Sequence, residues 1–554
     1  MISALICSPD FQLEMGQIDF ISSLKPVLEA IFELSGYGGP EHLLQYVGKP
    51  NEDGTRTLHG VQVFVLSLFY SLDNLPPELL QGVVHLPPNQ LLPLYAGWFA
   101  SPFVHHPRGE QNRAVLIENS SKIETAYPTS AGIGAVNTAW MHCSYADHPD
   151  KHQVKRSLNE IWRRLAGGSG LKSNHAPRTQ AERPTVVILA ERMLSGHAMQ
   201  RSYAKSIQQL RQRFRTVCVA VLGQFSEELQ SEFDEAIVLP GSMNIKDIGA
   251  RLVKLQPDII YYPSLGMSEW TQMTANFRFA PIQLMTLGHP APAMCDTMDY
   301  SLVQAGHGEA AKEFGNKVIE RKAWGHFAPF DEAISFDMPK QPFEDGRIHV
   351  AVNSSLMKLS PRFLSLCERI EAEAKRPVHF HFFASATGVM FDRISQVFES
   401  RFRHFTLEPA RRYQAFLQRL NDCDLALAAF PFGNTNSTVD TCLLGVPTVA
   451  YYANEVLSIG DRDVMRMVGL PSWLVADNDE DYFQTAMKLI HDDDARRGIV
   501  DQLKSMDVKA KLFQPPRPED ETEFVDAFWW IYQNHEALQA SSQHLLKVGE
   551  PIPA

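Results

Sequence analysis

Hydrogen-bonding side chains and a glycine gather between two apolar runs in the segment from Asp424 to Tyr452, a spacing suited to binding an anion. The segment reads DLALAAFPFGNTNSTVDTCLLGVPTVAYY. Its first apolar run predicts a strand buried on both faces, and the Pro, Gly and Asn residues that follow predict a turn. Asn436 or Ser437 can cap a short helix that Gly445 ends, before a second strand begins.

The predicted turn has the groups that hold a phosphate. In open parallel sheets, ligands bind outside the carboxyl ends of the strands, and a helix that begins there directs N–H groups and the positive end of its dipole at the ligand. Gly433 allows the backbone to approach closely, and further donors come from Asn434, Thr435 and Ser437. An ordinary capped helix after a tight turn is the alternative interpretation.

Asn436 and Asp440 are four residues apart and therefore lie on one face of the predicted helix. A carboxylate one turn away from a phosphate site is a poor phosphate ligand, but it is a good acceptor for the hydroxyl groups of ribose. Together with the turn, this pair of residues predicts a nucleotide site.

Three further candidates lie in predicted loops at crevice positions of parallel sheets. His197, in SGHAMQRS, precedes a predicted helix, and His289, in GHPA, follows a predicted strand. Lys358, in SSLMKLSP, lies between a strand and a helix, and we expect it to border the same crevice as the turn at 433–437. The alternatives are a turn histidine beside a proline for His289 and a solvated surface side chain for Lys358.

The composition argues against several classes of protein. The chain has 554 residues, a formal net charge of −13 and no long basic stripe, which argues against general binding to nucleic acid or to a membrane surface. Its seven cysteines are scattered without a CxxC pair, so they predict reduced core thiols and neither a disulfide framework nor a zinc site. We find no signal peptide and no apolar run that could span a bilayer, and therefore expect a cytoplasmic protein.

The order of the predicted elements indicates three domains. Residues 1–170 have apolar residues at helical spacing, divided into short helices by Pro76-Pro77, Pro87-Pro88 and Pro93, and predict an all-helical domain without a 34-residue repeat. Strands and helices alternate over 184–335 and again over 345–554, which is typical of parallel sheets covered on both faces. The predicted strands are 185–190, 216–222, 236–239, 258–262, 282–287, 349–353, 378–384, 425–430, 448–452 and 473–476.

Several motifs resemble signatures of the bacterial cytoplasmic N-glycosyltransferases, the family that glycosylates adhesins and that is related to the peptide O-GlcNAc transferases. The motifs are FPFGNTN followed by Asp440, MKLSPRFL, APIQLMTLGHPA, PDIIYYPSLGM, HFHF and VGLPSWLVA. The resemblance extends roughly from His197 to the end of the second alternating region. It implies an α/β fold of GT-B type, with two Rossmann-like lobes facing a cleft after an all-α N-terminal domain. Residues 184–335 would form the acceptor side, and residues 345–554 would bind the UDP-sugar.

The resemblance also implies roles for individual residues. Lys358 would contact the diphosphate, Thr435 and Asn436 would hold phosphate at the helix start, and Asp440 would bind ribose. His289 would lie near the diphosphate and the reacting centre, and Tyr413 would help to hold uracil. His197 is the third candidate for a catalytic role, beside His289 and Lys358. The segments EPARRYQ and VLSIGDRD lack histidines that are usual in the family, which leaves base recognition and the acceptor side open.

The reaction implied by the resemblance is an inverting, metal-independent transfer of a hexose, expected to be glucose, from a UDP-sugar to asparagine in Asn-X-Ser/Thr sequons. The donor would be the only cofactor-like ligand, and the acceptor would be a polypeptide such as an adhesin before export. Asp461-Arg462-Asp463 fits a metal-binding pattern, but we expect a surface loop there, and we predict no general base. A UDP-sugar-dependent O-glycosyltransferase acting on Ser/Thr or a glycan, or a non-catalytic UDP-sugar-binding protein, is the alternative.

Overall fold

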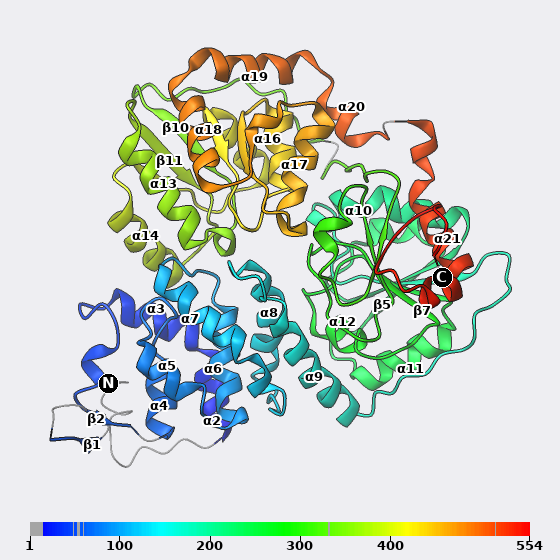
Figure 1. Cartoon of the computed structure of the whole chain (residues 1–554), viewed down its shortest axis with the longest axis horizontal. Helices are drawn as coiled ribbons and strands as arrows, with labels where there is room; N and C mark the ends of the chain where they lie inside the picture. Colours follow the sequence, from blue (N-terminus) through cyan, green and yellow to red (C-terminus); the bar gives the residue numbers. More distant parts are fainter. Residues whose placement is uncertain are drawn as a thin grey trace. The chain divides into compact units, whose positions relative to one another are not determined.

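The computed structural model describes residues 15–47, 49–52, 56–58, 60–330, 333–515 and 517–553 (Figure 1). The chain divides into two compact units. Unit 1 comprises the described part of residues 1–161 together with 349–411 and 429–431, and unit 2 comprises 162–348, 412–428 and the described part of 432–554. The division at 170–184 and at 335–345 into one helical domain and two lobes stays a prediction.

In its described residues, the N-terminal part of unit 1 consists of helices and one antiparallel pair of two-residue strands. Two of its helices, at Pro77 and Pro88, begin at the predicted prolines, because the first turn of a helix needs no N–H from that residue. The prediction that Pro93 divides two helices was wrong, since it lies inside α6. The elements are α2 (Met15–Ser23), α3 (Lys25–Leu34), β1 (Lys49–Pro50), β2 (Arg56–Thr57), α4 (Gly60–Ser67), α5 (Pro77–Val83), α6 (Pro88–Ala100), α7 (Pro107–Glu118), α8 (Ile133–His142) and α9 (Gln153–Gly168), the last of which runs into unit 2.

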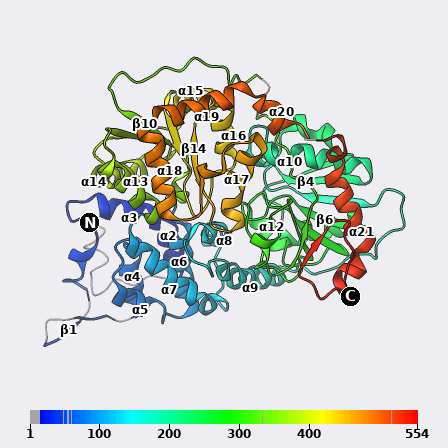
Figure 2. The ribbon, with the colours of Figure 1, turned by 45° about the horizontal axis from the view of Figure 1, so that its top comes forward.

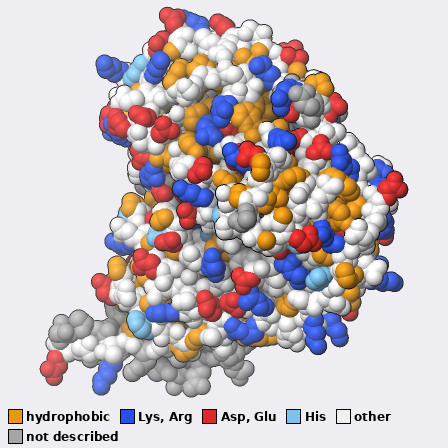
Figure 3. All heavy atoms as spheres, turned by 45° about the vertical axis from the view of Figure 1, so that its right-hand side comes forward, with side chains coloured by type: hydrophobic (Ala, Val, Ile, Leu, Met, Phe, Trp, Pro, Cys, Tyr) orange, Lys and Arg blue, Asp and Glu red, His pale blue; other side chains and the backbone are white. Residues whose placement is uncertain are grey.

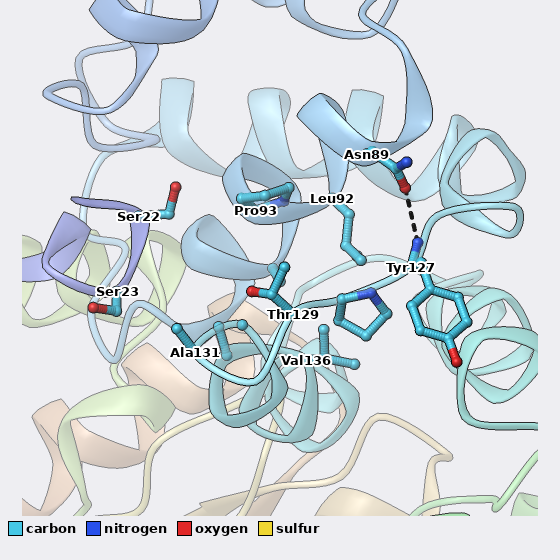
Figure 4. A pocket seen from close by; sticks show the side chains of 13 residues that line it. Ser22, Ser23, Asn89, Leu92, Pro93, Tyr127, Thr129, Ala131 and Val136 are labelled. Carbon is cyan, nitrogen blue, oxygen red and sulfur yellow. Dashed lines mark hydrogen bonds between the residues drawn. The ribbon is translucent and has the colours of Figure 1, made fainter. Parts of the chain in front are cut away.

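A small pocket lies among these N-terminal helices (Figure 4). Its lining includes Leu92 and Pro93 of α6, and Asn89 Oδ1 accepts a hydrogen bond of 2.9 Å from the backbone N–H of Tyr127 beside it. The cavity has a volume of about 20 Å³, which is room for one water molecule. None of the predicted site residues lines it.

Unit 1 also contains part of the second alternating region. An ion pair and an aromatic contact join this part to the N-terminal helices. Arg393 of α14 is 2% exposed and pairs with Glu33 of α3, and Phe398 stacks on Phe103 with ring centroids 6.0 Å apart. The elements of this part are β10 (Ile348–Val352), α13 (Pro361–Glu373), β11 (Val378–Phe382), α14 (Val389–Arg401) and β12 (Phe405–Leu407).

Unit 2 contains an eight-stranded parallel sheet with the order β16-β9-β8-β7-β6-β3-β4-β5. In the central register, Val187 pairs with Val217 on one side and with Ile260 on the other. The five predicted strands of this region are confirmed, and three more were not predicted. The strands are β3 (Thr185–Leu189), β4 (Arg215–Val221), β5 (Glu235–Leu239), β6 (Ile259–Tyr262), β7 (Ile282–Met285), β8 (Tyr300–Val303), β9 (Lys317–Glu320) and β16 (Leu545–Lys547).

Helices from distant parts of the sequence cover this sheet. They include α10 (Ala198–Gln209), α11 (Ile245–Leu255), α12 (Glu269–Thr274) and α21 (Glu523–Ala540). Helix α21 lies beside the sheet in both ribbon views (Figures 1 and 2), and its Phe524, Phe528 and Ile531 join the core formed by β3, β6 and β7. The far end of the described sequence is therefore part of the first sheet.

The second parallel sheet has three strands in each unit: β12, β11 and β10 in unit 1, and β13, β14 and β15 in unit 2. Ala426 pairs with Thr448, and Ala450 pairs with Val475. The unit 2 elements are β13 (Leu425–Leu427), α15 (Tyr413–Asp422), α16 (Asn436–Leu444), β14 (Thr448–Tyr451), α17 (Val456–Val468), β15 (Val475–Ala476), α18 (Asp479–His491), α19 (Asp493–Ser505) and α20 (Val508–Phe513). The predicted fold class of two Rossmann-like domains after a helical region is confirmed.

The surface and the cysteines agree with the composition. On the face shown in Figure 3, acidic and basic side chains are interspersed, and no basic stripe is visible. The six described cysteines are buried thiols outside any disulfide, as predicted, while Cys7 lies outside the described residues. Within the described ranges, we find no helix whose length and apolar character would let it cross a bilayer.

Candidate active site

The predicted strand–turn–helix–strand unit is present in unit 2, with the helix at the predicted place. Helix α16 begins at Asn436, directly after Thr435, and ends at Gly445, whose φ of 74° is the left-handed conformation that glycine adopts most easily. Thr435 has φ 45° and ψ −78°, a backbone conformation that a residue with a Cβ rarely adopts. Such strained residues persist only where their surroundings hold them, so the turn needs a partner.

That partner is Asp461 of α17, which is 1% exposed. Its carboxylate accepts hydrogen bonds from the backbone N–H groups of Asn434 (2.7 Å) and Thr435 (2.6 Å) and from the Thr438 hydroxyl (2.5 Å). The prediction that 461–463 forms a surface loop was wrong, since these residues lie within a helix and Asp463 is also buried. Asp461 thus fixes the turn from within the protein.

Two glycines make room for this arrangement. A Cβ on Gly433 would lie 2.3 Å from Asp461 Oδ2, and a Cβ on Gly460 would lie 2.2 Å from the Thr435 hydroxyl oxygen. The close approach predicted at Gly433 is therefore made by a carboxylate of the protein itself. Because the backbone N–H groups of Asn434 and Thr435 donate to Asp461, the groups suited to an anion are the first-turn amides of α16, which have no acceptor within their helix.

Asp440 lies one turn into α16, 3% exposed, and is bound by two side chains. Its Oδ1 accepts hydrogen bonds from the Tyr413 hydroxyl (2.5 Å) and from Arg201 Nη1 (2.8 Å). Burial raises the pKa of Asp440, and the positive charge of Arg201 opposes that rise. The structure therefore brings the predicted residues Asp440 and Tyr413 together, and adds Arg201, which was not predicted.

Two buried polar atoms beside Asp440 have no hydrogen-bond partner among the described residues. They are Asn436 Oδ1 and Arg201 Nε. The amide nitrogen of Asn436 is 3.4 Å from the Ser202 hydroxyl, so its oxygen faces the other way. Buried polar groups in proteins are nearly always satisfied, and an orphaned acceptor one turn from a carboxylate indicates a place where a ligand supplies the donors.

His289 lies close to the turn, and its place near a diphosphate stays a prediction. It is 5% exposed, and its ring stacks on Phe432 with centroids 5.9 Å apart and an angle of 27° between the ring planes. The preceding Gly288 is tightly enclosed, because a Cβ there would lie 2.1 Å from Met199 Sδ and 2.7 Å from the carbonyl oxygen of Pro263. The start of α10 and the loop after β7 therefore pack directly against each other.

His197 is the N-cap of α10. Its Nδ1 accepts a hydrogen bond of 3.2 Å from the backbone N–H of Met199, which places the ring proton of the neutral form on Nε2. Burial and the charge of Arg192 lower the pKa of His197, which favours the neutral imidazole. The side chain has a structural role that the sequence did not indicate, and its Nε2–H is a potential donor to a ligand.

Lys358 belongs to unit 1, at the end of a short 3₁₀ turn, Leu356–Lys358. Ser360 caps the next helix, accepting a hydrogen bond from the N–H of Phe363 (3.2 Å). The same hydroxyl donates to the carbonyl of Phe430 (2.7 Å), which fixes the Lys358 loop to the segment leading into the turn at 432–435. Contact between Lys358 and a diphosphate stays a prediction.

No cluster of three or more His, Cys, Asp or Glu side chains in the described parts of the chain is arranged to hold a metal ion. The Asp461 and Asp463 carboxylates are instead bonded within the protein. Asp463 Oδ2 lies 2.5 Å from His307 Nε2, and Asp461 holds the turn. Metal independence stays a prediction.

Comparison with known proteins agrees with this geometry. The family model described as HMW1 domain 2 matches residues 94–165. The chain is 27% identical over 497 residues to the UDP-glucose:protein N-beta-glucosyltransferase of Actinobacillus pleuropneumoniae serotype 5b (strain L20), an alignment that covers 83% of this chain and 77% of that protein. The chain is a homologue of this N-glucosyltransferase. The predicted resemblance is therefore confirmed.

Two further comparisons are with more distant proteins. The chain is 25% identical over 244 residues to the probable UDP-N-acetylglucosamine--peptide N-acetylglucosaminyltransferase SPINDLY of Solanum lycopersicum, covering 41% of this chain and 26% of that protein. The solved structure of the Thermobaculum terrenum O-GlcNAc transferase aligns with a TM-score of 0.61 at 15% identity, over 96% of this chain and 99% of that chain. At that identity the match shows the fold, and the chain has the fold of this glycosyltransferase.

Proposed function

We propose that the protein is an inverting glycosyltransferase that moves a hexose, expected to be glucose, from a UDP-sugar to the side-chain nitrogen of asparagine in Asn-X-Ser/Thr sequons. The observation that carries the proposal is the pair of acceptors on α16. Asp440 and the orphaned Asn436 Oδ1 lie one helical turn apart on the same face, which suits the two hydroxyl donors of a ribose diol. Homology to a protein N-glucosyltransferase supports the donor and the acceptor class.

The diphosphate would lie at the start of α16. The amides of Asn436 and Thr438 and the positive end of the helix dipole favour the negative charge that develops on the leaving phosphate. Following the family resemblance, we propose that Lys358 would add a positive charge and that no metal ion is needed. Tyr413, which shares Oδ1 of Asp440 with Arg201, helps to set the position of the nucleoside.

The acceptor would approach from the side formed by His197 and His289. His289 is held against Phe432, the residue before the glycine of the turn, which supports the proposal that its ring would lie near the diphosphate end of the donor. A neutral His197 can donate a hydrogen bond from Nε2 to an acceptor carbonyl. We propose no residue, among those that the structure describes, as the base that takes the proton from the asparagine amide.

The decisive test is transfer itself. The protein is incubated with UDP-glucose and a peptide that contains Asn-X-Thr, and the products are read by intact mass. We expect one added hexose, loss of the product when the peptide Asn is replaced by Gln, and full transfer in chelator. A chelator-sensitive reaction restored by magnesium would reject the metal-free mechanism.

An O-linked transfer is the second candidate, because the fold is also that of an O-GlcNAc transferase. The two reactions differ in the acceptor atom. Product that survives Asn→Gln in the peptide but is lost on Thr→Val would establish the hydroxyl as acceptor and reject the N-linked proposal.

A further inference from the structure

We propose that Arg201 is a positioning residue of the donor site, which holds the Asp440 carboxylate in the orientation and ionised form that accept the ribose hydroxyls. The inference rests on the proposed function, because it assumes that Asp440 binds the nucleoside. It adds a residue on α10, a helix that packs on the first sheet, to a site otherwise built by α15 and α16.

The guanidinium group of Arg201 is held by several groups at once. Its Nη1 lies 2.8 Å from Asp440 Oδ1, 3.2 Å from the carbonyl oxygen of Asn436 and 3.5 Å from the Tyr413 hydroxyl. Its carbon Cζ lies 4.4 Å from the centre of the Phe330 ring, and the whole residue is 1% exposed. A cation enclosed in this way cannot move to another partner without opening the site.

The two carboxylate oxygens of Asp440 differ in their hydrogen bonds. Both Arg201 and Tyr413 bind Oδ1, and no partner of Oδ2 is found among the described residues. The fixed oxygen determines the plane of the carboxylate, and the other oxygen remains as an acceptor. Because Nη1 also binds the Asn436 carbonyl, the same arginine fixes the turn of α16 that presents Asn436 Oδ1.

The charge of Arg201 also determines whether Asp440 is ionised. A carboxyl group buried to this extent is normally pushed toward its neutral form. Among the groups that face it, Arg201 from α10 opposes this effect most strongly, followed by the hydrogen bond from Tyr413 of α15. Cys442 on α16 itself also lies within reach of the charge of Asp440, and burial raises its pKa to about 12, so it stays neutral. Without Arg201, the pKa of Asp440 is expected to rise further.

The expected rise in the pKa of Asp440 can be tested, because a purely structural role of Arg201 would not make nucleoside affinity depend on pH. UDP and uridine affinities are measured by calorimetry between about pH 6 and pH 9 for wild type, Arg201→Met and Arg201→Lys. An acid whose pKa is raised loses its charge as pH falls through that pKa, so Arg201→Met should bind uridine about tenfold or more weakly at the acid end and recover at the alkaline end, one pKa unit being one factor of ten. Arg201→Lys should stay close to the wild-type profile.

Two controls accompany the profile. Arg211→Met removes a half-exposed arginine from the same segment and should bind like wild type. Adding Asp440→Asn to Arg201→Met should abolish the pH dependence, since the titrating group is then absent. If Arg201→Met melts below the assay temperature, Arg201→Gln and Arg201→Lys are compared with each other instead.

The contrary outcomes are distinct. An equal, pH-independent loss in Arg201→Met and Arg201→Lys, or unchanged affinity in both, would overturn the role of Arg201. A wild-type protein that binds neither UDP nor uridine would reject the donor site and this inference together. Tight UDP binding without transfer to the peptide would reject the proposed acceptor while leaving the Arg201 test decisive.

Discussion

The carboxylate of Asp461 accepts the backbone N–H of Thr435 at 2.6 Å and thereby holds a residue with φ 45° and ψ −78° at the start of α16. Thr435 directly precedes α16 and Asp461 lies in α17, so the conformation of the turn depends on how α17 packs against α16. A buried carboxylate beside a proposed phosphate site is electrostatically unfavourable. Its presence indicates that the stabilisation of the turn by Asp461 outweighs this electrostatic repulsion.

Replacing Asp461 should therefore impair diphosphate binding more than nucleoside binding. Asp461→Ala removes the acceptor for two N–H groups and a hydroxyl, and hydrogen bonds to a charged group contribute about 1.5–3 kcal/mol each. We expect a large fall in melting temperature and weaker UDP binding, with a smaller effect on uridine. Asp494→Asn, at an exposed ion pair, is the control. Equal losses for UDP and uridine would contradict a role confined to the turn.

Gly433 should not tolerate a methyl group. In Gly433→Ala the new Cβ would lie 2.3 Å from the Asp461 carboxylate, so the turn or the helix must shift, at about 1–3 kcal/mol. Gly498→Ala is the matched control, because Gly498 is a helical residue of α19 with open space around it, and alanine there should stabilise the protein by about 0.5–1 kcal/mol. Calorimetry of both variants measures the difference in melting temperature. Equal melting temperatures would show that the turn can move to accommodate a methyl group.

Asp440→Asn should affect both stability and nucleotide affinity. Because Asp440 is paired with a buried arginine, loss of its charge leaves Arg201 unpaired, which costs about 3–5 kcal/mol in buried pairs. A fall in melting temperature is therefore expected even if the residue binds ribose. A double-mutant cycle with Arg201→Met separates the effect on stability from the effect on nucleotide affinity, since the stability loss should be smaller in that background. Normal UDP affinity in Asp440→Asn would remove the residue from the ribose site.

His197 can be tested by keeping its cap and removing its ring. Asparagine is a good N-cap, so His197→Asn should keep the melting temperature, whereas His197→Ala should lose about 1 kcal/mol. If Nε2 serves the acceptor, both variants should lose transfer while binding UDP normally. Full transfer by His197→Asn would leave capping as its function.

Local patterns in the sequence were enough to predict the strand–turn–helix unit. The apolar runs, the glycine at 445 and the four-residue spacing of Asn436 and Asp440 are local signals, and each element formed within a few residues of its predicted place. The contacts that complete the site are not local. Asp461 lies 27 residues after Asn434, and Arg201 lies 239 residues before Asp440.

The wrong prediction of a surface loop at 461–463 has a physical explanation. A charged Asp-Arg-Asp sequence after a glycine is typical of a loop, yet apolar residues around it, including Val456, Ile459 and Val464, recur at helical spacing and are buried. The unpredicted strands β8, β9 and β16 are three or four residues long, and β16 exists only through its pairing with β9. Short strands of this kind depend on a partner that is remote in sequence.

The pairing of β16 with β9, and the packing of α21 on the core of the first sheet, have a consequence for how the protein is made. The ribosome synthesises β3 to β9 before any strand of the second sheet, so the side chains of the first sheet that α21 will cover are at first open to water. Synthesis of residues 523–547 closes that surface. Until then the emerging chain has an exposed apolar face, and during this interval a nascent-chain chaperone could bind that face.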